Sequence, residues 1–118
     1  MRTAQENVHT KVLGRQGEEL TVKYLKKHGY KILERNYKTP FGEADIVARK
    51  KDTYCFIEVK MRVSASYSPA EAVNEQKQQR YRLIARYFVS ACKREVDIRF
   101  DIASVTEEGI EYFENAFQ

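Results

Sequence analysis

Residue types that often build metal or redox centres are scarce in this sequence. Its 118 residues include two cysteines and two histidines. Cys55 and Cys92 lie in apolar surroundings without a CxxC spacing, which indicates free buried thiols rather than a bridging or catalytic role. His9 and His28 are far apart and neither belongs to an HxxxH pattern, so a zinc site is not expected. No GxxxxGK[ST] or GxGxxG loop occurs, which leaves no common nucleotide-binding motif.

Long apolar segments are also absent. Residues 1–10 lack the apolar stretch of a signal peptide, and no segment approaches the length of a membrane span. We therefore expect a cytoplasmic protein with no membrane partner. The sequence contains no internal repeat, low-complexity tract or linker, and its two prolines are isolated. This predicts a single domain over residues 1–118, in which residues 1–8 form a flexible arm.

The composition allows a packed core and favours an anionic partner. Hydrophobic residues make up 42% and aromatic residues 12%, while the net charge is +4 and the sequence pI about 9.1. The basic residues gather in patches: Arg49, Lys50, Lys51, Lys60, Arg62, Arg80, Arg82, Arg86, Lys93 and Arg94. Charge alone fits a solvated basic face as well as it fits nucleic-acid binding.

The first half of the chain has the pattern of one helix followed by three strands. A helix is predicted over residues 12–28, with Gly29 as its left-handed closing residue. Its positions Glu18, Thr21, Val22 and Leu25 share one face, so Glu18 begins an otherwise apolar stripe. Strands are predicted over residues 31–37, 43–48 and 53–60, and their short connections make them antiparallel neighbours.

The second half predicts another helix and a further strand. Two helix starts are possible: a capping box at residues 68–71, or Asn74 as N-cap, which we favour. The buried side of this helix is predicted to carry Tyr81, Ile84, Ala85, Phe88 and Cys92. A strand is expected over residues 97–105, and a short last one over 110–113. The order α-β-β-β-α-β predicts an α/β fold with a mixed central sheet flanked by helices.

Two of the predicted strands carry acidic residues where apolar alternation would be expected. Asp45 lies on the same face as Glu43, and Glu58 on the same face as Lys60. If Asp45 and Glu58 are neighbours, their repulsion must be relieved by a raised pKa, a cation or a metal ion. Two acids with a backbone carbonyl and waters suit Mg²⁺, which would activate water for phosphodiester hydrolysis.

Other residues complete this hypothesis. Lys60 would orient the water or stabilise the transition state, and Glu18 would act as a third acid or through a water. The alternative from spacing alone is a plain cross-strand salt-bridge cluster of Asp45, Glu58 and Lys60. Glu18 on a buried stripe is a second anomaly that favours a site.

These residues belong to motifs that resemble those of the bacterial YraN family. The motifs are Gly14-x-x-Gly17-Glu18, Gly29-Tyr30, Arg35-Asn36-Tyr37, Gly42-Glu43-x-Asp45 and Phe56-Ile57-Glu58-Val59-Lys60-x-Arg62, followed by Lys77 and an arginine-rich helix. That family resembles the PD-(D/E)xK nucleases, in the branch of the Holliday-junction resolvases. The resemblance implies a restriction-endonuclease-like αβββαβ core. It also implies Mg²⁺ or Mn²⁺ ligation by Asp45, Glu58 and the Val59 carbonyl, catalysis by Lys60, and an auxiliary acid at Glu18.

Three functions follow from these patterns. The first is a metal-dependent endonuclease for nucleic acid, especially branched or structured DNA. Its phosphate contacts would come from Arg15, Arg62, Lys77 and Arg80, and a homodimer is a possible assembly. The second is a non-catalytic nucleic-acid-binding module that uses Arg80, Arg82, Arg86 and Arg94. The third is an interaction domain with a solvating basic face. Ala44 and Ser68 depart from the family pattern without touching a proposed ligand, so they bear on substrate fit.

Overall fold

The fold comprises two helices and five strands in the computed structural model, which describes the backbone of residues 4–61 and 73–118 and side chains from residue 14 onward. The elements in chain order are α1 (Ala4–Lys27), β1 (Lys31–Thr39), β2 (Gly42–Lys50), β3 (Thr53–Met61), α3 (Glu75–Val89), β4 (Asp97–Thr106) and β5 (Gly109–Phe117). This order confirms the α/β class and the αβββαβ core, to which β5 adds a last strand.

The five strands form one mixed sheet in chain order, β1-β2-β3-β4-β5. Strands β1, β2 and β3 are antiparallel neighbours, as their short turns predict, and β4 and β5 form a second antiparallel pair. The pairing of β3 with β4 is parallel, and the connection between them contains α3. A parallel pair needs such a crossover, because its second strand must start at the same end of the sheet as the first.

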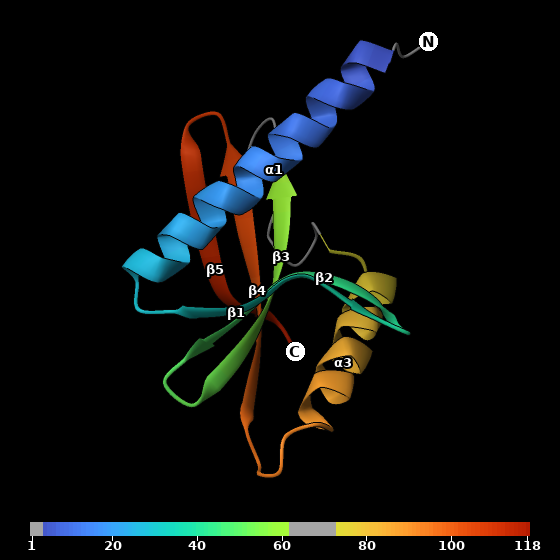
Figure 1. The fold of residues 1–118 in the computed structure, drawn as a ribbon, viewed down its shortest axis with the longest axis vertical. Helices are drawn as coiled ribbons and strands as arrows, with labels where there is room; N and C mark the ends of the chain where they lie inside the picture. The colour runs from blue at the N-terminus through green and yellow to red at the C-terminus, as the bar shows by residue number, and fades with distance from the viewer. Residues whose placement is uncertain (1–3, 62–72) are drawn as a thin grey trace.

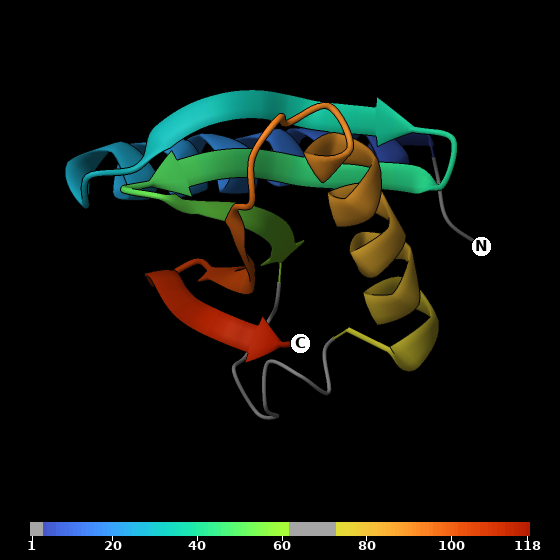
Figure 2. The same ribbon diagram turned by 90° about the horizontal axis from the view of Figure 1, so that it is seen from below.

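The two helices lie on opposite faces of the sheet (Figure 1 and Figure 2). One apolar cluster joins Val22 and Leu25 of α1 to Ile46, Cys55 and Ile57. The other cluster joins α3 to the opposite face, through Tyr81, Ile84, Ala85, Ala44, Val47, Phe56, Phe100 and Ile102. Both faces of the central strands are therefore buried, which is why β3 is apolar over most of its length.

Helix α1 is longer than the sequence pattern predicts. It begins at Ala4 rather than at residue 12, so part of the expected arm over residues 1–8 is helical, and its flexibility stays a prediction. No proline or glycine interrupts residues 4–13, and that stretch can extend the helix without an amphipathic signal. At the other end Gly29 has a φ of +87° and the Tyr30 N–H donates to the Leu25 carbonyl at 2.9 Å, which confirms the predicted closing glycine.

Helix α3 begins where the favoured interpretation places it. The Asn74 side chain accepts a hydrogen bond from the Lys77 N–H at 2.8 Å, and the alternative start at residues 68–71 lies outside the described residues. Tyr81, Ile84 and Ala85 are buried as predicted. The helix ends at Val89, so Cys92 is not on its buried stripe, and its thiol is half-buried rather than fully buried.

The strands differ from the sequence pattern in two places. Strand β5 runs from Gly109 to Phe117, well beyond the short strand expected at residues 110–113. Simple alternation places Ala44 with Ile46 and Ala48, yet Ala44 packs in the α3 cluster and the other two pack in the α1 cluster. Neither described helix contains an apolar stretch long enough to cross a membrane.

Candidate metal centre

The acidic residues of β2 and β3 lie where these two strands stop pairing. The last paired residues of the β2–β3 ladder are Ile46 and Ile57. Asp45 and Glu58 are the next residue on each strand beyond this last pair. Their carboxyl groups interact by a hydrogen bond and by charge, and Lys77 of α3 acts on both, so the two acids adjoin as the sequence predicts.

The Asp45 carboxyl replaces part of the missing strand ladder. Its Oδ2 accepts a hydrogen bond from the Val59 N–H at 2.8 Å. Burial is the main cause that raises the pKa of Asp45 from 3.8 to about 7, and the hydrogen bond and charge of Glu58 raise it further. The Val59 N–H and the charge of Lys77 act in the opposite direction without cancelling these effects. Near neutral pH this group is poised between its two protonation states.

The Glu58 carboxyl is 6% exposed and has one charged partner in the described part of the chain. Lys77 Nζ of α3 lies 2.7 Å from Glu58 Oε2. The angle between the ammonium group and Glu58 Oε2 is poor for a hydrogen bond. The other described groups donate no hydrogen bond to Oε2. One ammonium group compensates one carboxylate, so the adjacent acids Asp45 and Glu58 leave a place for a further positive group.

A tyrosine hydroxyl from α3 bridges the separated strands. The Asp45 N–H donates to the Tyr81 hydroxyl at 3.4 Å, and that hydroxyl donates to the Ile57 carbonyl at 3.3 Å. Tyr81 is 1% exposed, and burial followed by the charges of Glu58 and Asp45 raises its pKa well above 10.0. Helical periodicity alone predicts Tyr81 as a residue of the apolar stripe. A buried tyrosine needs a partner for its hydroxyl, and that was the available signal.

Glu18 of α1 is close enough to Asp45 for the charges of the two carboxyl groups to interact. Its carboxyl is 20% exposed, and burial followed by the charge of Asp45 raises its pKa. Asn36, which has a φ of +52°, holds this acid from β1. In the amide orientation that satisfies both groups, its nitrogen donates to Glu18 Oε1 at 3.2 Å and to Glu43 Oε1 at 3.1 Å.

The donor set suits a small divalent cation that keeps several waters. Among the described residues no three His, Cys, Asp or Glu side chains come close enough to hold a metal ion together, so Glu18 fits only through a water. The N–H of Val59 points toward Asp45, and the C=O of a strand residue points to the same edge as its N–H. Two carboxylates and one carbonyl at this edge match the coordination that Mg²⁺ accepts.

The predicted cations occupy different positions around this centre. Lys60 is half-buried and forms no ion pair with a described carboxylate, whereas Lys77, predicted as a phosphate contact, is paired with Glu58. Arg80 is exposed and lies one turn after Lys77. Its side chain runs past Gly42, where a Cβ added to the glycine would lie 3.5 Å from Arg80 Cδ. Arg62 lies outside the described residues.

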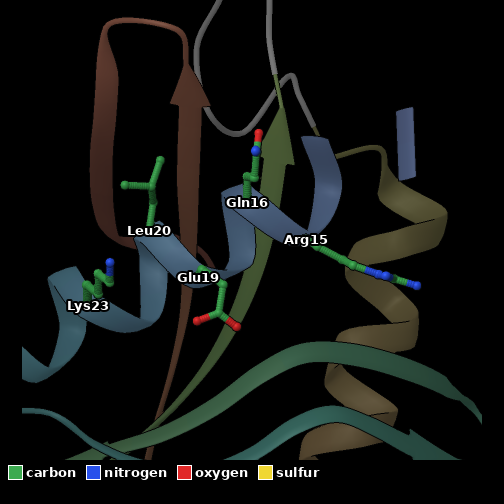
Figure 3. A pocket seen from close by; sticks show the side chains of 5 residues that line it. All are labelled: Arg15, Gln16, Glu19, Leu20 and Lys23. Atoms are coloured by element: carbon green, nitrogen blue, oxygen red, sulfur yellow. The ribbon is translucent and has the colours of Figure 1, made fainter. Parts of the chain in front are cut away.

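Arg15 is exposed on α1. It lines a pocket of about 490 Å³ together with Gln16, Glu19, Leu20 and Lys23 (Figure 3). In that view Arg15 and Glu19 leave the helix on one side and Gln16 and Leu20 on the other. None of the residues proposed to bind metal lines this pocket, so it is separate from the candidate centre.

The arrangement of elements is also found in a solved Holliday junction resolvase. The chain is similar to the solved Holliday junction resolvase of Archaeoglobus fulgidus, with a TM-score of 0.59 and 24% identity over 82% of this chain and 72% of that one. At this identity the similarity shows the fold.

The chain belongs to the uncharacterised protein family UPF0102, which its residues 17–105 match. A UPF0102 protein of Thermodesulfovibrio yellowstonii is 45% identical over 89% of this chain and 95% of its own length. A UPF0102 protein of Alkaliphilus metalliredigens is 46% identical over 92% of this chain and 99% of its own length. UPF0102 is the YraN family, so the family resemblance read from the sequence motifs is confirmed.

Proposed function

We propose that this protein is a Mg²⁺- or Mn²⁺-dependent endonuclease that hydrolyses phosphodiester bonds of nucleic acid. The observation that carries the proposal is the buried pair Asp45 and Glu58 at the separated end of β2 and β3, with a carboxylate oxygen that accepts no hydrogen bond. A nuclease-like fold and a pKa of about 7 for Asp45 support it, because perturbed carboxyl groups gather at functional sites.

Asp45, Glu58 and the Val59 carbonyl would hold the cation. When bound, it lowers the pKa of a water and neutralises charge that develops on the scissile phosphate. Lys60, on the same strand face as Glu58, would stabilise that charge as well. Glu18, held by Asn36, would accept a hydrogen bond from the attacking water and so orient it.

DNA with a branched or otherwise irregular structure is the substrate class we propose, bound by Arg15, Arg62, Lys77 and Arg80. A homodimer would allow two symmetric cuts in a four-way junction. Two arginines of the alternative binding module are already engaged. Arg82 donates to the Gln118 carbonyl and pairs with Glu75, and Arg94 lies 4.0 Å from Asp52. This weakens the case for a four-arginine phosphate surface.

The test is cleavage of labelled duplex, flap, four-way-junction and single-stranded DNA and of RNA, with Mg²⁺, Mn²⁺ or EDTA. Asp45→Asn and Glu58→Gln should abolish cutting, whereas Glu95→Gln at an exposed position should not. Cutting that survives in both site variants would refute the proposed centre. Metal-independent binding without cutting, equal in Glu58→Gln and wild type, would establish the binding module instead.

A further inference from the structure

We infer that the Lys77 ammonium group is the counter-ion of Glu58 in the metal-free protein, and that a divalent cation must displace it to bind. The inference rests on the proposed function, because it assumes that Glu58 is a metal ligand. It concerns a step that precedes catalysis: the exchange of one cation for another on the same carboxylate.

The contact between Lys77 and Glu58 has the properties of an exchangeable pair. Nζ lies 2.7 Å from Oε2, yet that oxygen accepts no well-directed hydrogen bond. The two side chains also differ in exposure, at 6% for Glu58 and 38% for Lys77. The lysine is therefore able to leave toward solvent on its flexible stem, while the carboxylate stays fixed in the fold.

Alternative partners for Glu58 are scarce in the described part of the chain. Asp45, which adjoins Glu58, is itself acidic, and Lys60 on the same strand forms no ion pair with Glu58. Removing Lys77 without a replacement would leave two adjacent buried carboxyl groups, an arrangement that strongly favours cation uptake. A divalent ion at this place compensates both carboxylates, which one ammonium group on Oε2 does not.

Displacement has a consequence for nucleic-acid binding. Once released, Lys77 lies at the first turn of α3 and one turn before exposed Arg80, so it becomes available to a phosphate. Metal binding would thus convert an internally paired lysine into a phosphate ligand. Nucleic acid would then bind more tightly in Ca²⁺ than in EDTA, with part of the gain carried by Lys77.

Mn²⁺ affinity of the whole chain, measured by titration calorimetry in mildly alkaline buffer, tests the exchange. Lys77→Met should bind Mn²⁺ about fivefold more tightly than wild type, because the competing ion pair is gone. Arg80→Met is the matched control, since it removes the same charge from the same helix without freeing a carboxylate, and it should change the affinity less than twofold. Equal or weaker binding by Lys77→Met would overturn the inference.

A measurement on the wild-type protein guards against misfolding of the Lys77→Met variant. The side-chain ¹⁵N signal of Lys77, assigned through its loss in Lys77→Arg, should shift on Mg²⁺ addition together with the backbone amide of Val59. A shift of Val59 with an unchanged Lys77 signal would overturn the exchange and leave the metal centre intact. No shift of either signal would overturn the metal centre and with it the exchange.

Discussion

The buried carboxyl pair predicts that the wild-type protein is less stable than a variant without the Asp45 charge. The pKa of Asp45 is 3.8 in an unperturbed chain and about 7 in the fold, with burial as the main cause and Glu58 as the next. Between these pH values the folded protein holds a proton that the unfolded chain has released. The free energy of unfolding therefore falls as the pH rises through this range, and the loss is complete above pH 7 or so.

The size of this effect follows from the same values. A pKa change from 3.8 to about 7 corresponds to about 4 kcal/mol of lost stability. Asp45→Asn keeps the side-chain shape and an oxygen that accepts from the Val59 N–H. The expected gain is smaller than about 4 kcal/mol, because water and small rearrangements already relieve part of the repulsion in the wild type. We expect a gain of about 2 kcal/mol at about pH 8 and below about 0.5 kcal/mol at about pH 4. For a chain of this size, the larger gain is a rise in Tm of roughly 8 °C.

Urea denaturation in EDTA at the two pH values measures this difference. Asp97→Asn, at an exposed position on β4, serves as the control for loss of one negative charge. Adding Mg²⁺ should stabilise the wild type and leave Asp45→Asn unchanged, because binding to the folded state alone raises stability. The reasoning is refuted if Asp45→Asn is no more stabilising at the higher pH than at the lower one.

Three further outcomes follow from single contacts. Tyr81→Phe should lower the free energy of unfolding by about 1–2 kcal/mol in urea denaturation, because the strand groups bridged by its hydroxyl lose their partner. Gly14→Ala should raise the free energy of unfolding by about 0.5–1 kcal/mol, since an added Cβ meets nothing within 4 Å. Gly17→Ala should raise it by less, because the added Cβ would lie 2.5 Å from the Met61 sulfur. A thiol reagent should label half-buried Cys92 in the native protein but leave Cys55 unlabelled until denaturant is added, since burial raises the pKa of Cys55 to about 12.

The fold could be predicted where hydrophobic periodicity and turn chemistry agree. The strands from Lys31 to Met61 and the cap at Asn74 fall within two residues of their expected places. The start of α1 was missed because its first residues carry no apolar stripe, and periodicity is the signal on which a helix prediction depends. The face change of Ala44 was missed because two-residue alternation assumes regular pairing, whereas the partner strand β1 contains Asn36 at a positive φ.

The candidate site could be predicted in its acids but not in its cations. The strand pattern is enough to predict that Asp45 and Glu58 adjoin, because the short turn makes β2 and β3 neighbours, although their ladder ends one residue earlier, at Ile46 and Ile57. It does not determine which lysine reaches them. Lys77 approaches from α3, whose position depends on the packing of the whole α3 face, whereas the strand pattern placed Lys60 beside the acids. The roles of all these residues stay predictions until metal binding and cleavage are measured.

A second buried aspartate shows why the Asp45 pair, and not every buried acid, is the candidate centre. Asp101 on β4 is 0% exposed, yet it is fully compensated. The Arg99 guanidinium donates to both of its oxygens, the Tyr112 hydroxyl lies 2.5 Å from Oδ2, and the Asn115 N–H lies 2.9 Å from Oδ1. This carboxylate has no need of a further cation, and it fixes the irregular pairing of β4 with β5.

The same substitution should therefore have opposite effects at the two aspartates. Asp101→Asn removes the nearer charged partner of the largely buried Arg99, which keeps only the more distant and exposed Glu114 among the described residues. It should lower the free energy of unfolding by about 3 kcal/mol. Asp45→Asn should raise it at the same alkaline pH. Both variants are measured by the same urea denaturation in EDTA, so differences in method cancel. If both substitutions destabilise the protein, the compensation of a buried carboxylate does not distinguish a structural acid from a metal ligand in this fold, and the case for the Asp45 centre loses its physical basis.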